Sequence, residues 1–112
     1  MARVHPPIPE PILEGAAQVI KCLGHPLRLR LLEALEQGEL SVRDLQEASG
    51  ASQAAVSEQL GILRGRGVVG ARRDGAFVLY RITEPKVRKI LACIRSCDTA
   101  ERRPSFVPGR SA

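Results

Sequence analysis

Three cysteines are the residues of this 112-residue chain best able to form bonds to a ligand: Cys22, Cys93 and Cys97. Cys93 and Cys97 are four residues apart, so on a helix their thiols would lie on one face. Three thiolates suit a trigonal thiophilic centre such as As(III), because soft ligands select soft ions. Two neighbouring thiols could instead form a disulfide or a polysulfide bridge, and cysteine can also serve simply as a small buried apolar residue. The sequence indicates thiol chemistry and leaves these alternatives open.

The composition is that of a small folded protein, and its excess of basic residues indicates a negatively charged partner. The chain has 17 Lys and Arg against 12 Asp and Glu, a net charge of +5 and a pI near 9.7. Most of the basic residues are Arg, which suits phosphate and guanine contacts and favours nucleic acid as the partner. With 3% aromatic residues, a single core must be built from Leu, Ile, Val and Ala, which favours packed helices. Two His and no Gly-rich phosphate loop or nucleophile-elbow motif argue against an enzyme.

The chain shows no signal for a membrane or for export. No apolar run reaches the roughly 18 residues of a membrane span, and the N-terminal segment lacks a signal-peptide core. We therefore expect a cytoplasmic protein whose three cysteines remain thiols and do not form a structural disulfide framework.

Residues 41–63 carry the pattern that must position any DNA-reading side chains. Ser41 with Asp44 predicts a capped first helix, residues 50–52 form a small-residue turn, and Ser52 can cap a second helix. Apolar residues of the second helix recur at spacings of three and four. Two short helices joined in this way are typical of a helix-turn-helix, whose second helix can enter the DNA major groove. Such hairpins also occur in purely structural bundles, so the flanking elements must decide.

Helices are predicted on both sides of this unit. Residues 12–23 are apolar around more than one face, which indicates burial against a second subunit. Pro26 is placed to begin the next helix, and we interpret His25 as a capping or turn residue. Thr83 is predicted to cap a last helix that runs to Cys97.

A change to strand-like periodicity follows the helix pair. Residues 68–73 and 76–82 are β-prone runs on either side of Asp74-Gly75, a pair favoured in two-residue hairpin turns. A hairpin directly after a helix-turn-helix is the wing of a winged-helix domain. The predicted fold is therefore mainly α with a small β-hairpin: a dimeric winged helix-turn-helix with five helices plus a wing.

The predicted domain is bordered by two flexible segments. Residues 1–11 hold four prolines and should form a flexible arm, residues 12–97 the folded domain, and residues 98–112 a flexible, basic tail.

Several motifs together resemble one family. The runs LGHPLRLRLLEAL, ELSVRDLQEASGASQAAVSEQLGILRGRGVV and RRDGAFVLYRIT are similar to the ArsR/SmtB family of bacterial winged-helix repressors over residues 12–97. The resemblance implies a homodimer formed through the first and last helices. It also implies binding to an inverted-repeat operator in double-stranded DNA, with transcription blocked until an inducer binds.

The resemblance also implies which residues face DNA. Those on the recognition helix would read bases, since Gln pairs with adenine edges, Ser with bases or phosphates, and the Ala methyl group contacts thymine. Arginines after that helix and in the wing would contact phosphates. The base-reading set is Ser52, Gln53, Ala54, Ser57 and Gln59, and the phosphate-contacting set is Arg64, Arg72 and Arg73.

The inducer is predicted from what the chain lacks. Family members that bind arsenite through the helix preceding the turn of the helix-turn-helix carry an ELCVCDL motif there. This chain has Ser41 and Arg43 in place of the two thiols of that motif. Residues 83–97 contain no His and one carboxylate, so the zinc, cobalt or nickel site of the last helix is also absent.

The cysteines remain as the predicted site of induction. We expect As(III) or Sb(III), bound by Cys22, Cys93 and Cys97, to release the operator, with no obligatory cofactor. The alternative is a redox or persulfide switch at the same cysteines, although the thiol that the sulfur-responsive branch carries on the second helix is replaced by Glu33. A more remote alternative is a winged helix used only as a protein-interaction module.

Overall fold

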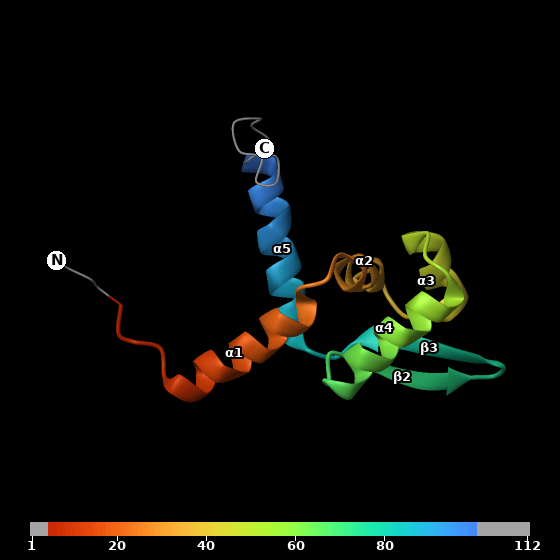
Figure 1. Cartoon of the computed structure of the whole chain (residues 1–112), viewed down its shortest axis with the longest axis horizontal. Helices are drawn as coiled ribbons and strands as arrows, with labels where there is room; N and C mark the ends of the chain where they lie inside the picture. The colour runs from red at the N-terminus through yellow and green to blue at the C-terminus, as the bar shows by residue number, and fades with distance from the viewer. Residues whose placement is uncertain (1–4, 101–112) are drawn as a thin grey trace.

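The computed structural model describes residues 5–100 and, within them, five helices and a three-stranded antiparallel sheet. In chain order the elements are α1 (Glu10–Leu23), α2 (Pro26–Leu35), β1 (Leu40–Ser41), α3 (Val42–Ser49), α4 (Gln53–Gly65), β2 (Val69–Asp74), β3 (Phe77–Ile82) and α5 (Pro85–Ala100). Helices α2, α3 and α4 pack together against the sheet, whereas α1 and α5 project away from this body in different directions (Figure 1). This arrangement confirms the winged helix-turn-helix prediction.

The helix starts follow from local side-chain caps. The Nδ1 atom of His25 accepts a hydrogen bond from the backbone N–H of Leu27 at 3.2 Å, which makes His25 the N-cap of α2. Ser41 and Asp44 form a reciprocal capping box at the start of α3. The hydroxyl of Ser52 accepts from the N–H of Ala55 at 3.1 Å and caps α4. These three predicted caps are confirmed.

The N-terminal starts of α1 and α5 differ from the prediction. Helix α1 begins at Glu10, two residues earlier than predicted, because Pro11 fits the first turn of a helix, where its missing N–H is not needed. Thr83 does not cap α5. Its hydroxyl donates to the carbonyl oxygen of Gly67 at 3.0 Å, and the carboxylate of Glu84 accepts from the N–H of Lys86 at 3.1 Å.

The sheet also corrects the prediction in two places. Strand β1 was not predicted and pairs with β3, so the order is β1-β3-β2. Asp74 pairs with Phe77, which makes Gly75-Ala76 the two-residue loop, one position later than the predicted Asp74-Gly75 turn. Gly75 has φ +64°, a conformation that glycine adopts without a steric penalty.

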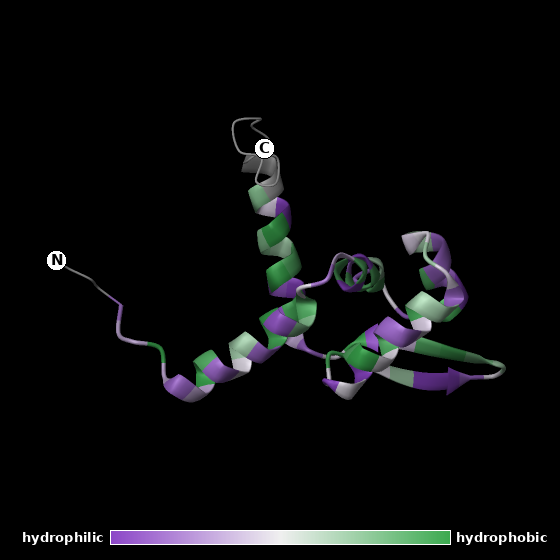
Figure 2. Ribbon diagram, in the orientation of Figure 1, coloured by the Kyte–Doolittle hydropathy of each residue, from purple (hydrophilic) through white to green (hydrophobic). Residues whose placement is uncertain are grey.

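The core lies between α2, α3, α4 and the base of the sheet. Its least exposed side chains are aliphatic, as the low aromatic content predicts: Leu31, Leu32, Leu35, Leu45, Val56, Leu60, Leu63, Val68 and Val87. Beyond Leu91, the described side chains of α5 are exposed, and α1 is exposed over most of its length. Figure 2 shows apolar residues along both of these projecting helices.

The flexibility predicted for the two terminal segments stays a prediction. Residues 5–9 are exposed and have no regular structure, while residues 1–4 and 101–112, which include most of the predicted tail, lie outside the described range. Residues 98–100 continue α5. Across residues 5–100, no helix is both long and apolar enough to cross a bilayer.

Candidate nucleic-acid interface

Helix α4 divides into a buried face and an exposed face. Val56, Leu60 and Leu63 point into the core and are at most 1% exposed. Gln53, Ala54 and Ser57 lie on the opposite side and are exposed. Because residues three and four apart are neighbours on a helix, these polar and small side chains form one patch in the first turns of α4.

Ser52 extends this patch beyond the helix start. It is exposed, and while its oxygen caps α4 its O–H hydrogen can still donate to an acceptor. The N-terminal end of a helix also carries partial positive charge, which favours a phosphate nearby. The structure therefore brings together four of the five residues predicted to read bases.

Gln59 is the exception and is a correction to the predicted set. Its side chain is 9% exposed, and its Oε1 atom accepts a hydrogen bond from Nε of Arg28 on α2 at 2.7 Å. The side chain therefore lies inside the protein and cannot reach a base edge. Its spacing could have indicated this, because Gln59 is three residues after Val56 and four before Leu63, both of which are buried.

The three predicted phosphate contacts lie at separate points. Arg64 is exposed in the last turn of α4, and Arg73 is exposed near the tip of β2. Arg72 is already held by Glu39, with Nη2 of Arg72 to Oε1 of Glu39 at 2.7 Å and Nε to Oε2 at 2.9 Å. The hydrogen bond from Arg72 lowers the pKa of the Glu39 carboxyl below its ordinary value, so Glu39 stays ionised and continues to compete with phosphate.

We expect Glu39→Gln to strengthen binding to any DNA duplex by roughly two- to ten-fold. The substitution removes the carboxylate that holds Arg72 and leaves the guanidinium available to a phosphate. One added phosphate contact should steepen the slope of log K against log salt concentration by about 0.9. A titration of binding at several salt concentrations measures both quantities.

Glu14→Gln is the matched control, because it removes the same charge from the exposed side of α1. It should leave the salt slope unchanged. An unchanged slope in Glu39→Gln as well would mean that Arg72 does not contact phosphate.

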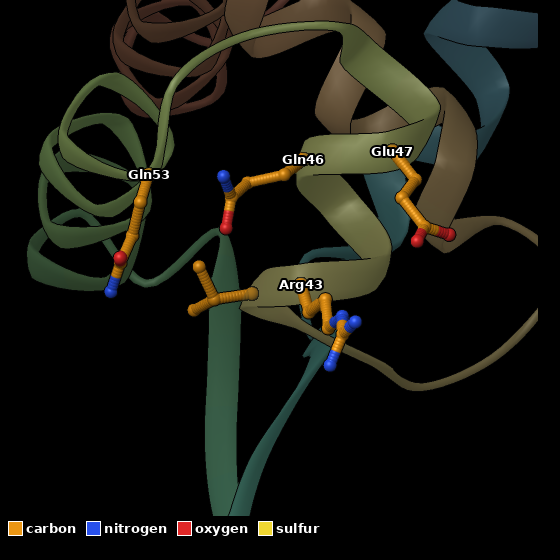
Figure 3. A pocket seen from close by; sticks show the side chains of 5 residues that line it. Arg43, Gln46, Glu47 and Gln53 are labelled. Carbon is orange, nitrogen blue, oxygen red and sulfur yellow. The ribbon is translucent and has the colours of Figure 1, made fainter.

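A hollow between α3 and α4 lies beside the predicted base-reading residue Gln53 and adds four residues that were not predicted to face DNA. It has a volume of about 450 Å³ and is lined by Val42, Arg43, Gln46, Glu47 and Gln53. Figure 3 shows Gln46 projecting from α3 toward the side of the hollow where Gln53 lies. The exposed Arg43 in the first turn of α3 was the available signal, since a cation there adds to the charge beside the exposed face of α4.

The structure does not bring the three cysteines together in one chain. Cys22 is 2% exposed near the end of α1, whereas Cys93 and Cys97 are exposed on α5. Among the described residues, no group of three or more His, Cys, Asp or Glu side chains could hold a metal ion. The predicted three-thiol centre is therefore not formed within a single subunit.

Glu33 and Glu36 instead face the arginine between the two exposed cysteines. Arg95 forms an ion pair with Glu36 and lies 4.0 Å from a carboxylate oxygen of Glu33, and the hydrogen bond to Glu36 raises the pKa of Arg95. The cysteine-bearing turn of α5 is thus attached to α2 through charged groups.

Comparison with known proteins agrees with this geometry. Residues 25–70 match the family described as bacterial regulatory protein, arsR family. An uncharacterised HTH-type transcriptional regulator of Mycobacterium tuberculosis is 41% identical over 87 residues, which cover 77% of this chain and 76% of that protein.

Two solved structures are similar over most of their length. The AntR antimony-specific transcriptional repressor has a TM-score of 0.77 and 35% identity, covering 88% of this chain and 91% of its own. A homodimeric winged helix-turn-helix DNA-binding domain from Mycobacterium bovis has a TM-score of 0.69 and 30% identity, covering 87% and 92%. The chain therefore belongs to the ArsR family of winged helix-turn-helix proteins and is a DNA-binding transcriptional repressor, not an enzyme.

Proposed function

We propose that this repressor acts as a homodimer on an inverted-repeat operator and is released by As(III) or Sb(III) bound at Cys93 and Cys97. The observation that carries the proposal is the exposure of both thiols, one helical turn apart on α5.

The dimer is supported by the distribution of exposed apolar side chains. Of the six large hydrophobic residues that are strongly exposed among the described residues, five lie on α1, just before it, or on α5: Ile8, Ile12, Leu13, Ile20 and Ile94. Apolar patches of this kind mark interaction sites. The M. bovis relative is a homodimer of the same fold, and a dimer of this chain would cover both projecting helices.

The operator contacts follow from the exposed face of α4. We assign base contacts to Ser52, Gln53, Ala54 and Ser57, because these side chains form one exposed patch at the start of the helix. Arg64 and Arg73 supply phosphate contacts. Arg72 supplies a third when its ion pair with Glu39 breaks. Two such helices in a symmetric dimer would read two half-sites about one turn of DNA apart.

The spacing of the two thiols favours a metalloid over a simple disulfide. Residues four apart on a helix have Cβ atoms about 5–6 Å apart, whereas a disulfide needs about 3.5–4.5 Å. An arsenic or antimony atom placed between the two sulfurs bridges the wider gap without unwinding the helix. Each sulfur that bonds to the arsenic of arsenous acid displaces one hydroxyl group as water, with the thiol proton leaving in that water.

Metalloid binding would act on α5 and then on the dimer. Arg95 lies between Cys93 and Cys97 and holds Glu36 at the end of α2, so a change in this turn reaches the body of the domain. A shift of α5 in a dimer changes the spacing of the two recognition helices. A coupling of about 1–3 kcal/mol would weaken operator binding by roughly 5- to 150-fold.

The test measures release from an operator selected by the protein itself from random-sequence DNA. Release is titrated with arsenite, antimonite, zinc, peroxide and polysulfide, for the unaltered chain and for Cys93→Ser/Cys97→Ser. We expect arsenite or antimonite to release the unaltered protein, and the double variant to bind the operator normally but not to release it.

Cys22→Ser is the control, because Cys22 is buried in the single chain whereas Cys93 and Cys97 are exposed, and this variant should respond like the unaltered protein. Release by polysulfide or peroxide, but not by arsenite or antimonite, would favour the redox or persulfide switch over the metalloid site. Release of the double variant by arsenite would overturn the assignment of the site. Weak DNA binding without sequence preference would favour the protein-interaction module.

A further inference from the structure

Gln59 is an unusual residue for the buried face of a recognition helix. It is the one buried polar residue among residues 5–97, and it lies between the apolar positions of Val56 and Leu63. A buried amide without a partner costs about 1–3 kcal/mol, so its hydrogen bond matters for folding. The Nε atom of Arg28 donates that bond to Oε1 of Gln59 at 2.7 Å.

Arg28 makes a second bond that leads away from the recognition helix. Its Nη1 atom donates to the carbonyl oxygen of Cys22 at 2.8 Å. Cys22 is the second-last residue of α1, so this carbonyl is one of those at a helix C-terminus that have no partner within the helix. A cation at this end of a helix is also favoured by the helix dipole.

One half-buried side chain thus connects three helices. Arg28 belongs to α2 and donates one hydrogen bond to α1, at the carbonyl oxygen of Cys22, and one to α4, at the side chain of Gln59. The guanidinium group is planar and its donors have fixed directions, so both bonds together define where the end of α1 lies relative to α4. Arg30, two residues later, shows the contrast: its side chain is 60% exposed and pairs with Glu33 on the same helix.

A second contact region reinforces the connection between α1 and α4. A small cavity of about 100 Å³ lies beside Cys22 and is lined also by Gln18, Val19, Arg66 and Val68. The last turn of α1 therefore meets α4 near its middle, through Arg28, and again just after its end, at Arg66.

We propose that Arg28 is a positioning residue that sets the placement of the recognition helix relative to α1. The exposed apolar residues of α1 are assigned to the dimer interface. Arg28 therefore links the position of α1 in the dimer to the position of the DNA-reading face of α4. Arg28 does this without touching DNA. The inference rests on the proposed function only in that α4 reads DNA as part of a dimer, and it is independent of the inducer.

The test compares Arg28→Met, Gln59→Met and the double variant in the full-length chain. Each single variant leaves a group without its partner and should lower the thermal unfolding temperature. The double variant replaces both polar groups by apolar ones of similar length and should regain much of the lost stability. Binding is measured to the operator selected by the unaltered protein and to an unrelated duplex, each at several salt concentrations.

We expect all three variants to bind the selected operator about ten-fold more weakly with an unchanged salt slope. Affinity for the unrelated duplex should stay unchanged in Gln59→Met and fall only slightly in the variants that lack the charge of Arg28. The loss in the double variant should not exceed that of either single variant, because one connection is broken in each case. A purely structural role would restore operator binding in the double variant together with stability, and would overturn the inference.

Two further outcomes would also overturn it. A salt slope reduced by about 0.9 in Arg28→Met would show that Arg28 contacts a phosphate directly. Failure of the unaltered chain to select any sequence would overturn the proposed function, and this inference with it.

Discussion

Replacing Ile20 by Glu should give a folded monomer that binds its operator at least about 100-fold more weakly. Ile20 lies on α1 and is 61% exposed in the single chain, so a charge there does not disturb the core. In the proposed dimer the carboxylate would be buried against the partner's apolar surface, at a cost of several kcal/mol. A monomer contacts one half-site only and loses the contribution of the second. Sedimentation equilibrium gives the oligomeric state, and band-shift titration gives the affinity.

Phe77→Glu is the matched control for this prediction. Phe77 is also 61% exposed and apolar, but it lies at the tip of the wing, away from α1 and α5. Phe77→Glu should remain a dimer by sedimentation, since only a side chain in the interface can separate the subunits. If Ile20→Glu stays dimeric at the same protein concentration as Phe77→Glu, the subunits do not meet through α1.

The parts of the fold that were predicted from sequence depend on local interactions. The caps at His25, Ser41 and Ser52 each involve residues two or three positions apart, so the sequence contains the whole interaction. Two of the features that were missed depend on partners far along the chain. Strand β1 has two residues, too few for a periodic pattern, and exists because Leu40 pairs with Tyr80. Thr83 was expected to cap α5, but its hydroxyl is taken by Gly67, sixteen residues earlier.

The candidate site divides in the same way. The exposed positions of Gln53, Ala54 and Ser57 follow from helical spacing, so the sequence could predict them. The inward position of Gln59 requires a cation from α2, and the ion pair of Arg72 requires Glu39, 33 residues earlier. Sequence spacing also could not place Cys22 relative to the cysteines of α5, because α1 and α5 project in different directions from the body of the domain (Figure 1).

Gln53→Glu should weaken operator binding by roughly 10- to 100-fold, with little change in the unfolding temperature. Gln53 is the first residue of α4 and lies exposed beside the hollow that Arg43 and Gln46 line. The substitution keeps the size of the side chain but removes its amide donor, which costs about 1–3 kcal/mol where the amide pairs with a base, and adds a negative charge near phosphates. A carboxylate in the first turn of a helix is favoured by the helix dipole, so the fold should not be weakened. Band-shift titration and thermal unfolding measure the two effects separately.

The structure offers an isosteric control in Gln37→Glu, which makes the same change of charge at an exposed position just after α2. Gln37 lines a hollow with Arg30, Glu33 and Arg95, none of which is assigned to DNA contact. The change in net charge is equal in the two variants, so it lowers long-range attraction to DNA equally. Any further loss in Gln53→Glu therefore reports contact at that residue. Equal affinities of the two variants would mean that the first turn of α4 does not read the operator, and the base contacts would have to be sought elsewhere on the helix.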